Sequence, residues 1–170
     1  MKNIVLIGMP GTGKSVVGQA LARQFQYQFV DVDDLIADAA GMTLPDILRS
    51  KGLEAFLEIE EAVGMSVALE NTVIATGGSM VLSDGAMQNL RKTGLVVWLE
   101  TPLSKISDRM PDDLIDRGIA APAGMTIREI YHHRQPLYAQ YADLIVVSQE
   151  DPETTAQQVE TMMRTVGVAL

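Results

Sequence analysis

The sequence predicts an α/β protein in which helices cover both faces of a five-stranded parallel sheet, giving a three-layer α/β/α fold. Five short apolar runs alternate along the chain with segments of helical periodicity, the order typical of such a sheet. A glycine-rich loop follows the first run, at the edge of the sheet where these folds bind ligands. The chain has 170 residues, 47% of them hydrophobic, which suffices for one substantial core, so we expect a single domain over residues 1–170.

The charge and composition argue against several classes of partner and site. The 22 acidic residues exceed the 13 basic ones, giving a formal charge of −9, and they are scattered along the chain. Binding to the phosphates of a nucleic acid or of an anionic membrane needs clustered positive charge, so we expect neither kind of partner. The chain has no cysteine for a disulfide or a thiolate metal site, and no apolar run approaches the roughly 18 residues of a membrane span. We therefore expect a soluble cytoplasmic protein, monomeric, with a weak dimer as the alternative.

Residues 8–15, with the sequence GMPGTGKS, follow the apolar run at 4–7 and precede a helical segment from 15 to 24. Glycines let a backbone wrap closely around phosphates, and the helix points its free N–H groups and positive dipole end at the anion. This context predicts a nucleotide-binding P-loop, in which Lys14 reaches the β- and γ-phosphates and the Ser15 hydroxyl binds Mg²⁺. The alternative is a glycine-rich turn that binds nothing.

Acidic residues follow the second apolar run, at 28–31. Asp31 ends this strand, and Asp33 lies in the first turn of a helical pattern that stops at Gly41. Because ligands bind outside the carboxyl ends of the strands, we expect Asp31 and Asp33 to project into the same cleft as Ser15. The alternative is that these acids merely favour the first turn of a helix.

The segment before the third strand predicts two more helices. Thr43 and Asp46 form a capping box for a short helix that reaches about Arg49. Apolar residues then repeat at helical spacing and predict a longer amphipathic helix over 53–69. We assign the helices over about 32–70 to substrate binding.

Paired glycines follow the third strand, which we place at 72–76. Gly77 and Gly78 would let a ligand approach the backbone closely, whereas a plain turn is the alternative. The fourth strand is expected at 95–99, and Thr101-Pro102 is expected to cap and start the next helix.

The apolar pattern is lost in a loop over about 110–124, which carries Arg117 near its centre. A loop of this length in a compact domain is usually functional or mobile, so we expect a mobile lid. Thr126 opens a further helix that is expected to stop near Pro136. A fifth strand at 143–147 precedes a C-terminal helix that begins at Asp151-Pro152.

A P-loop occurs in switch GTPases, in motor ATPases and in kinases that act on small molecules. A GTPase needs a guanine-reading Asn-Lys-x-Asp after a strand, and none follows the fourth or fifth run. A motor or assembly ATPase usually needs a longer chain or a basic surface. The remaining class is a compact small-molecule kinase, which works by positioning and charge neutralisation.

Several motifs resemble those of the shikimate kinase family, within the nucleoside-monophosphate-kinase-like P-loop enzymes. The similarity runs nearly from end to end. The matching stretches are the P-loop at 8–15, Asp31-Val32-Asp33 for the family's Asp-x-Asp, Gly52, Phe56 and Glu60 for its Gly-Glu-x-x-Phe-Arg-x-x-Glu, Ala75-Thr76-Gly77-Gly78 for its substrate turn, and Arg134-Gln135-Pro136-Leu137-Tyr138 for its Arg-x-Pro-Leu-Tyr.

The resemblance implies a role for each matching residue. It implies phosphorylation of shikimate by ATP and Mg²⁺, with three catalytic residues: Lys14, Asp33 and the lid residue Arg117. The metal is assigned to Ser15 and Asp31, and the substrate to Asp33, Gly77, Gly78 and Arg134, the last for its carboxylate. The nucleotide is assigned to Gly11, Thr12, Gly13, Lys14, Ser15, Val16, Arg109, Arg117 and Pro152.

Three departures from the family pattern lie in its substrate and lid motifs. Leu57 stands where the family has a substrate-clamping arginine, Ser79 replaces its third glycine, and Arg117-Gly118-Ile119 replaces its Arg-Pro-Leu. A kinase acting on another small polyhydroxy acid or alcohol is therefore the second hypothesis. A non-catalytic nucleotide-binding regulatory domain is the third.

Overall fold

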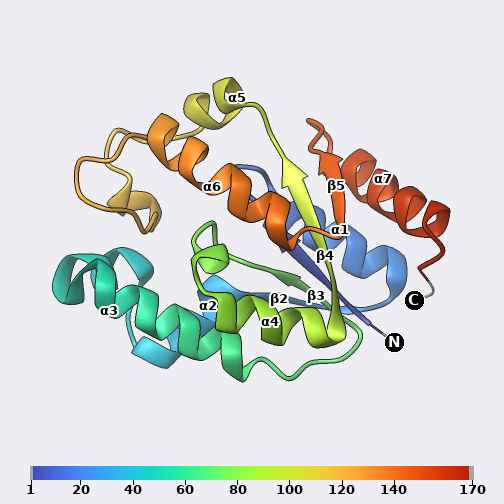
Figure 1. Cartoon of the computed structure of the whole chain (residues 1–170), viewed down its shortest axis with the longest axis horizontal. Coiled ribbons are helices and arrows are strands. Elements are labelled where there is room, and N and C mark those ends of the chain that lie inside the picture. The colour runs from blue at the N-terminus through green and yellow to red at the C-terminus, as the bar shows by residue number, and fades with distance from the viewer. Residues whose placement is uncertain (1, 169–170) are drawn as a thin grey trace.

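The structure is a computed structural model that describes residues 2–168. Its five strands form one parallel sheet in the order β2-β3-β1-β4-β5, which confirms the predicted architecture (Figure 1). The strands are β1 (Asn3–Ile7), β2 (Gln28–Asp31), β3 (Thr72–Ala75), β4 (Gly94–Glu100) and β5 (Leu144–Val147). The helices are α1 (Lys14–Phe25), α2 (Val32–Ala40), α3 (Leu44–Ser66), α4 (Asp84–Thr93), α5 (Leu103–Asp108), α6 (Ile127–Tyr141) and α7 (Pro152–Thr165), with 3₁₀ turns η1 (Met80–Leu82) and η2 (Ile115–Arg117).

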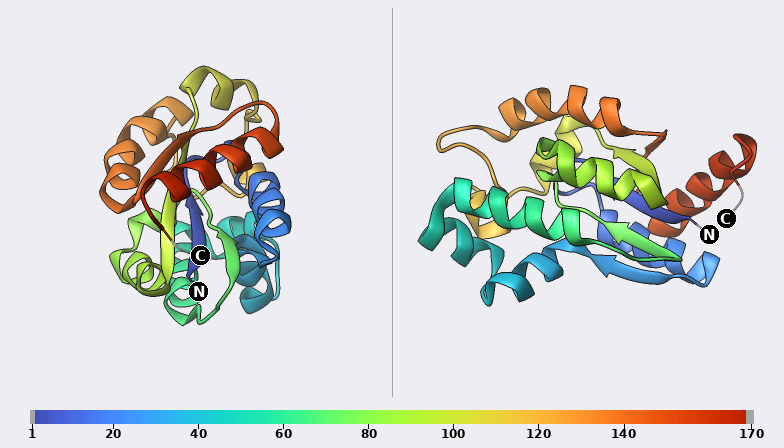
Figure 2. Two further views of the ribbon diagram at one scale, coloured as in Figure 1. Left: turned by 90° about the vertical axis from the view of Figure 1, so that its right-hand side faces the viewer. Right: turned by 60° about the horizontal axis from the view of Figure 1, so that its bottom comes forward.

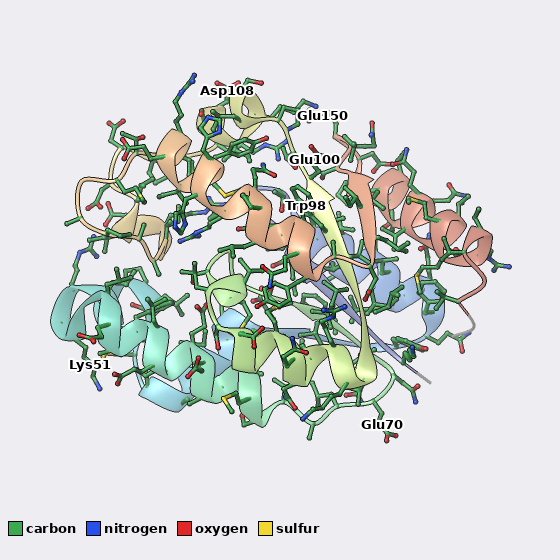
Figure 3. All side chains as sticks on the ribbon, viewed as in Figure 1. Lys51, Glu70, Trp98, Glu100, Asp108 and Glu150 are labelled. Carbon is green, nitrogen blue, oxygen red and sulfur yellow. The ribbon has the colours of Figure 1, made fainter. Side chains whose placement is uncertain are left out.

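Alternate residues of β1 enter two separate cores, one on each face of the sheet. Ile4 and Leu6 pack with residues of α1 and α7, whereas Val5 and Ile7 pack with residues of α3, α4 and α6. Trp98 of β4 lies beneath α6 and packs against Tyr138, with ring centroids 5.8 Å apart (Figure 3). The three central strands β3, β1 and β4 are therefore buried on both faces, which explains their largely apolar sequences, whereas the edge strands β2 and β5 are partly exposed (Figure 2).

Three of the predicted helix starts are confirmed. Thr43, Thr126 and Asp151 each cap a helix by accepting a hydrogen bond from the backbone N–H three residues later. The two helices expected after Thr43 are both present within α3 and meet at Gly52, whose φ of 86° is not helical. Glycine adopts this conformation without strain, so the helix can change direction at that residue.

Two expectations about helix ends are wrong. Helix α6 continues past Pro136 to Tyr141, although the proline lacks an N–H to donate to the preceding turn. Such a proline costs about 3 kcal/mol, but Tyr138 and Tyr141 beyond it are almost fully buried, and each large buried side chain contributes about 1.5–3 kcal/mol. At α5, Pro102 is the N-cap and makes no capping bond, and the Thr101 hydroxyl is buried without a partner among the described residues.

The crossover from β3 to β4 contains a helix that the sequence analysis did not assign. Ser83 caps α4 by accepting a hydrogen bond from the Ala86 N–H, and Met87 and Leu90 are buried against the sheet. The cap and the apolar spacing were both present in the sequence, so this helix was detectable. Over residues 2–168, no helix has the length and apolar character required to cross a membrane.

Candidate active site

The loop between β1 and α1 has the backbone geometry of an anion site. Gly11 and Gly13 have φ values of 81° and 84°, in the left-handed region that glycine adopts without strain. Gly13 is the N-cap of α1, and no side chain caps the first turn of this helix. The N–H groups at the start of α1 are therefore available to bind an anion.

Lys14 is folded into this loop and is almost fully buried. Its ammonium donates to the carbonyl oxygens of Gly8 at 2.8 Å and Met9 at 2.7 Å. Burial lowers the pKa of Lys14 to about 8, although the charges of Asp33 and Asp31 act in the opposite direction. The side chain thus carries a positive charge at neutral pH at the position where phosphates would lie.

Ser15 and Asp31 are brought together from α1 and the end of β2. The Ser15 hydroxyl donates to Asp31 Oδ2 at 2.6 Å, and Asp31 Oδ1 accepts from the Asp33 N–H at 3.0 Å, which caps α2. Magnesium prefers hard oxygen ligands and usually keeps several waters and substrate phosphates. The Ser15 hydroxyl and the Asp31 carboxylate supply hard oxygens at one point and so fit part of such a coordination shell.

Two further carboxylates, Asp33 and Glu60, lie against the glycine turn after β3. A Cβ atom added to Gly77 would lie 2.8 Å from Asp33 Oδ1 and 3.3 Å from Glu60 Oε2, so a side chain there would displace these carboxylates. Burial raises the pKa of Asp33 to about 6, with a smaller contribution from the Asp31 charge, and burial raises the pKa of Glu60 to about 7. Both carboxyls therefore titrate near neutral pH.

Arg134 supplies a buried positive charge beside these acids. It is 3% exposed, and its guanidinium donates to the Ala120 carbonyl oxygen. A Cβ added to Gly78 would lie 3.2 Å from Arg134 Nη1, and the Tyr138 hydroxyl donates to the Gly78 carbonyl oxygen at 2.7 Å. The glycine turn is thus fixed between α6 and the end of β3, with the arginine at its side.

Arg117 enters the site from the loop that was predicted to be a lid. The loop contains the 3₁₀ turn η2, and Arg117 at its end is exposed to solvent and lines the same cavity. Arg49 of α3 forms ion pairs with Asp116 and, at 3.4 Å, with Asp113. The loop therefore contacts the first part of α3 across the opening of the site.

One cavity of about 280 Å³ joins these groups, although they are far apart in the sequence. It contains most of the predicted site residues, from the P-loop, the end of β2, the glycine turn, the lid and α6: Gly11, Gly13, Lys14, Ser15, Val16, Asp31, Asp33, Gly77, Gly78, Arg117 and Arg134. The side chains predicted to bind phosphate and those predicted to bind the acceptor thus line one cavity.

Three residues predicted to contact nucleotide do not line this cavity. The Thr12 side chain is buried, so only its backbone could face a phosphate. Arg109 donates to the Gly11 carbonyl oxygen at 2.6 Å and lies 3.8 Å from a carboxylate oxygen of Glu150, at the C-terminal end of the sheet (Figure 3). Pro152 begins α7, two residues beyond Glu150. Arg109 and the segment before α7 therefore flank the P-loop from outside the cavity.

Several residues without a predicted role also line the cavity, and two of them, Glu60 and Ser79, contact each other. Glu60 is 2% exposed, and the Ser79 hydroxyl lies 2.7 and 2.9 Å from its two carboxylate oxygens. Glu60 was recognisable from the motif in which it stands, but its contact with Ser79 joins two elements and has no local signature. Leu53 is a further departure from that same motif, since it stands where the motif has its first glutamate.

Comparisons with known proteins agree with this geometry. A family model described as shikimate kinase matches residues 10–165. The shikimate kinase of Sulfurihydrogenibium sp. is 34% identical over 96% of this chain and 99% of its own length, and that of Caldanaerobacter subterraneus is 37% identical over 94% of each. The solved structure of shikimate kinase from Acinetobacter baumannii in complex with shikimate has a TM-score of 0.86 and 26% identity, covering 99% of this chain and 96% of its own. The chain belongs to the shikimate kinase family.

Proposed function

We propose that this protein transfers the γ-phosphoryl group of ATP to a hydroxyl of shikimate, giving shikimate 3-phosphate and ADP. The single observation that supports this most strongly is the shared cavity, in which Lys14 and Ser15 of the P-loop face Asp33 and Arg134. The shikimate complex of the Acinetobacter baumannii relative supports the choice of acceptor. We expect the protein to act as a soluble cytoplasmic monomer, with no nucleic-acid or membrane partner.

The proposed mechanism uses the charges on both sides of the cavity. Lys14 and Arg117 offset negative charge that develops on the transferring phosphoryl group. Asp33 accepts a hydrogen bond from the attacking hydroxyl, orients its oxygen towards phosphorus and takes its proton as the O–P bond forms. Arg134 binds the substrate carboxylate.

The nucleotide lies over the first turn of α1. The N–H groups of residues 11–16 bind its phosphates, while Arg109 and Pro152 pack beside the adenine. Ser15 and Asp31 would hold Mg²⁺, which would supply positive charge to offset that of the nucleotide phosphates. Because a carboxylate and a hydroxyl are only part of a magnesium coordination shell, metal binding is expected to depend on the nucleotide.

The function is tested by following ADP formation with ATP and Mg²⁺ in the presence and absence of shikimate, and by identifying the product by phosphorus NMR. We expect ADP release that depends on shikimate and a new phosphomonoester signal. ATP turnover that ignores shikimate would exclude this acceptor, and nucleotide binding without any turnover would favour a regulatory domain.

Because burial shifts the pKa values of three groups in the site, we expect kcat/KM to depend on pH. The carboxyls of Asp33 and Glu60 must be ionised to act, and their pKa values are raised to about 6 and about 7, so activity should be lost as the pH falls through this range. Lys14 must be protonated, and its pKa is lowered to about 8, so activity should also fall as the pH rises past that value. A profile that is flat between pH 5.5 and 9 would contradict these assignments.

The loop over 110–124 is proposed to act as the lid. Closure would bring Arg117 to the phosphates and exclude water that would otherwise hydrolyse ATP. We expect hydrogen exchange in this loop to slow when a nonhydrolysable ATP analogue and shikimate are both bound. Peptides from the C-terminal half of α4, at the opposite end of the sheet from the P-loop, provide the internal control. Equal exchange in the lid with and without ligands would contradict the proposal.

A kinase for another small polyhydroxy acid or alcohol is the second candidate, and one observation favours it. Leu53 and Leu57 line an apolar cavity of about 160 Å³ that adjoins the first cavity at Ala120 and Arg134. A leucine at position 57 offers no charge to a carboxylate, so Arg134 is left to bind the acid without the family's second arginine.

Substitution Leu57→Arg distinguishes the two acceptors. A charge-assisted bond contributes about 1.5–3 kcal/mol, and about 1.4 kcal/mol corresponds to tenfold in affinity. If shikimate is the acceptor, its KM should fall about ten- to a hundredfold in Leu57→Arg, while Leu57→Met, which keeps the volume, should behave as the wild type. If the true acceptor has no carboxylate, all three proteins should be nearly inactive on shikimate. A low KM in the wild type that Leu57→Arg does not improve would show that another group already replaces the arginine.

A further inference from the structure

Glu60 is an acidic residue buried in the acceptor side of the cavity. Among residues 2–168, its carboxylate receives hydrogen bonds from Ser79 and takes part in none of the ion pairs. Ser79 itself is 5% exposed and comes directly before η1, across the glycine turn from α3. A hydroxyl has one proton to donate, so it is shared between the two carboxylate oxygens.

The charged groups that face Glu60 come from two other helices. Asp33 of α2 shares the surface of Gly77 with Glu60 and opposes its ionisation, whereas Arg134 of α6 favours it. Arg134 reaches the neighbouring glycine, Gly78. The Glu60 carboxylate thus lies between the repelling charge of Asp33 and the attracting charge of Arg134. Its orientation therefore depends on the group that donates a hydrogen bond to it.

Position 57 lies one helical turn before Glu60 on α3. Residues three apart on a helix are neighbours, so a cation at position 57 would lie beside the Glu60 carboxylate. The family motif that this stretch resembles has an arginine at position 57, where this chain has leucine. At position 53 the motif has a glutamate, and this chain again has leucine. At position 79 the opposite exchange has occurred, because a serine hydroxyl stands where the resemblance gives a glycine. One candidate partner of Glu60 is lost, and another is present.

We propose that Ser79 is a positioning residue, whose hydroxyl holds the Glu60 carboxylate beside Arg134 in place of a cation at position 57. The inference rests on the proposed function and deepens it: Glu60 keeps a negative charge next to Arg134, so that the guanidinium is oriented for the substrate carboxylate. Ser79 acts through Glu60 and touches neither reacting atom. The φ of −94° at Ser79 is open to any residue, so the serine is there for its hydroxyl rather than for the backbone.

The electrostatics of the site agree with this role. Burial raises the pKa of Glu60, and the Ser79 hydrogen bond is the foremost influence that lowers it again, ahead of the Arg134 charge. A buried carboxylate that loses its hydrogen bond is costly to keep ionised. Removing the hydroxyl should therefore raise the pKa of Glu60 further, so that less of the ionised form is present at neutral pH and Arg134 more often lacks its neighbouring negative charge.

The first experiment follows Glu60 directly, without substrate. Protein labelled with ¹³C at the glutamate carboxyls is titrated by NMR, and Glu60 is assigned by the signal that disappears in Glu60→Gln. We expect the Glu60 pKa to rise by about one unit or more in Ser79→Ala, and to return towards the wild-type value in Ser79→Thr, which restores a hydroxyl. An unchanged Glu60 titration in a folded Ser79→Ala protein would overturn the proposal, whether or not shikimate is the acceptor.

The second experiment is a double-mutant cycle on shikimate kinetics. We expect Ser79→Ala to raise the KM for shikimate about tenfold and to shift the acid limb of the pH profile upwards, with the KM for ATP unchanged. In the Leu57→Arg background the same change should cost less than threefold, because the guanidinium takes over Glu60. Equal costs in the two backgrounds would contradict the exchange of partners. If the wild type does not phosphorylate shikimate, the proposed function fails, and the NMR titration still decides the role of Ser79.

Discussion

Lys14→Ala should reduce kcat by about 10²–10³ or more while the protein stays folded. The ammonium is buried at the start of α1 and bonded to two carbonyl oxygens of the loop. Its charge would act on the transferring phosphoryl group in the cavity that the side chain lines. Because the variant also removes a buried charge whose pKa is lowered by burial, its melting temperature should not fall greatly.

Steady-state kinetics with saturating ATP and shikimate provide the measurement, with circular dichroism as the test of folding. Lys92→Ala is the matched control, since Lys92 is an exposed lysine near the end of α4, immediately before β4 begins. That position lies at the opposite end of the sheet from the P-loop, so the control should keep full activity. Wild-type turnover in Lys14→Ala would refute the role given to Lys14.

Asp33→Asn should reduce kcat by about 10²–10⁴, which is the range expected when a positioned acid-base group is lost. The amide keeps the size of the side chain but cannot accept a proton from the attacking hydroxyl. Asp31 should still cap α2 in this variant, because the capping bond uses the Asp33 backbone N–H. The loss should therefore be one of chemistry rather than of local folding.

The same variant should be more stable than the wild type. The folded-state pKa of Asp33 is raised to about 6, so ionisation favours the unfolded chain, and this destabilisation develops as the pH rises from about 4 to 6. Above that range Asp33→Asn should gain about 1–2 kcal/mol in free energy of unfolding, and at pH 4 it should gain nothing.

Asp34→Asn is the control for both effects, because Asp34 is the next residue of α2 and is exposed. The kcat and the free energy of unfolding of Asp34→Asn should both stay close to those of the wild type. A variant Asp33→Asn that turns over normally would remove Asp33 from the proton transfer. One that is less stable than the wild type at pH 8 would show that the carboxylate is a structural ion rather than a strained catalytic group.

The proposed pairing of Glu60 with Ser79 has a consequence for how the site diverges within its family. Leu53 and Leu57 remove a potential charge pair from α3, yet Glu60 remains on the same helix. A buried carboxylate without a partner is costly, so a substitution elsewhere that supplies a hydrogen bond would be favoured. Position 79 meets this requirement because it lies across the glycine turn from α3.

The sequence by itself determined the P-loop, the strands, most helix starts and the family. Each of these depends on residues within about four positions of one another, such as Thr43 with the N–H three residues later, or on an apolar run that is buried on both faces. The motifs also identified most of the residues that line the cavity, since they stand at the carboxyl ends of strands in a sheet whose polarity was already predicted.

Only the tertiary structure decided the strand order, the continuation of α6 beyond Pro136 and the contact between Glu60 and Ser79. The strand order depends on which apolar faces pack together. The proline is tolerated because the tyrosines that follow it are buried against the sheet. Glu60 and Ser79 are 19 residues apart, and no local pattern links them. Their contact exists because α3 and the turn after β3 are packed on the same core, and packing between elements is a property of the whole fold.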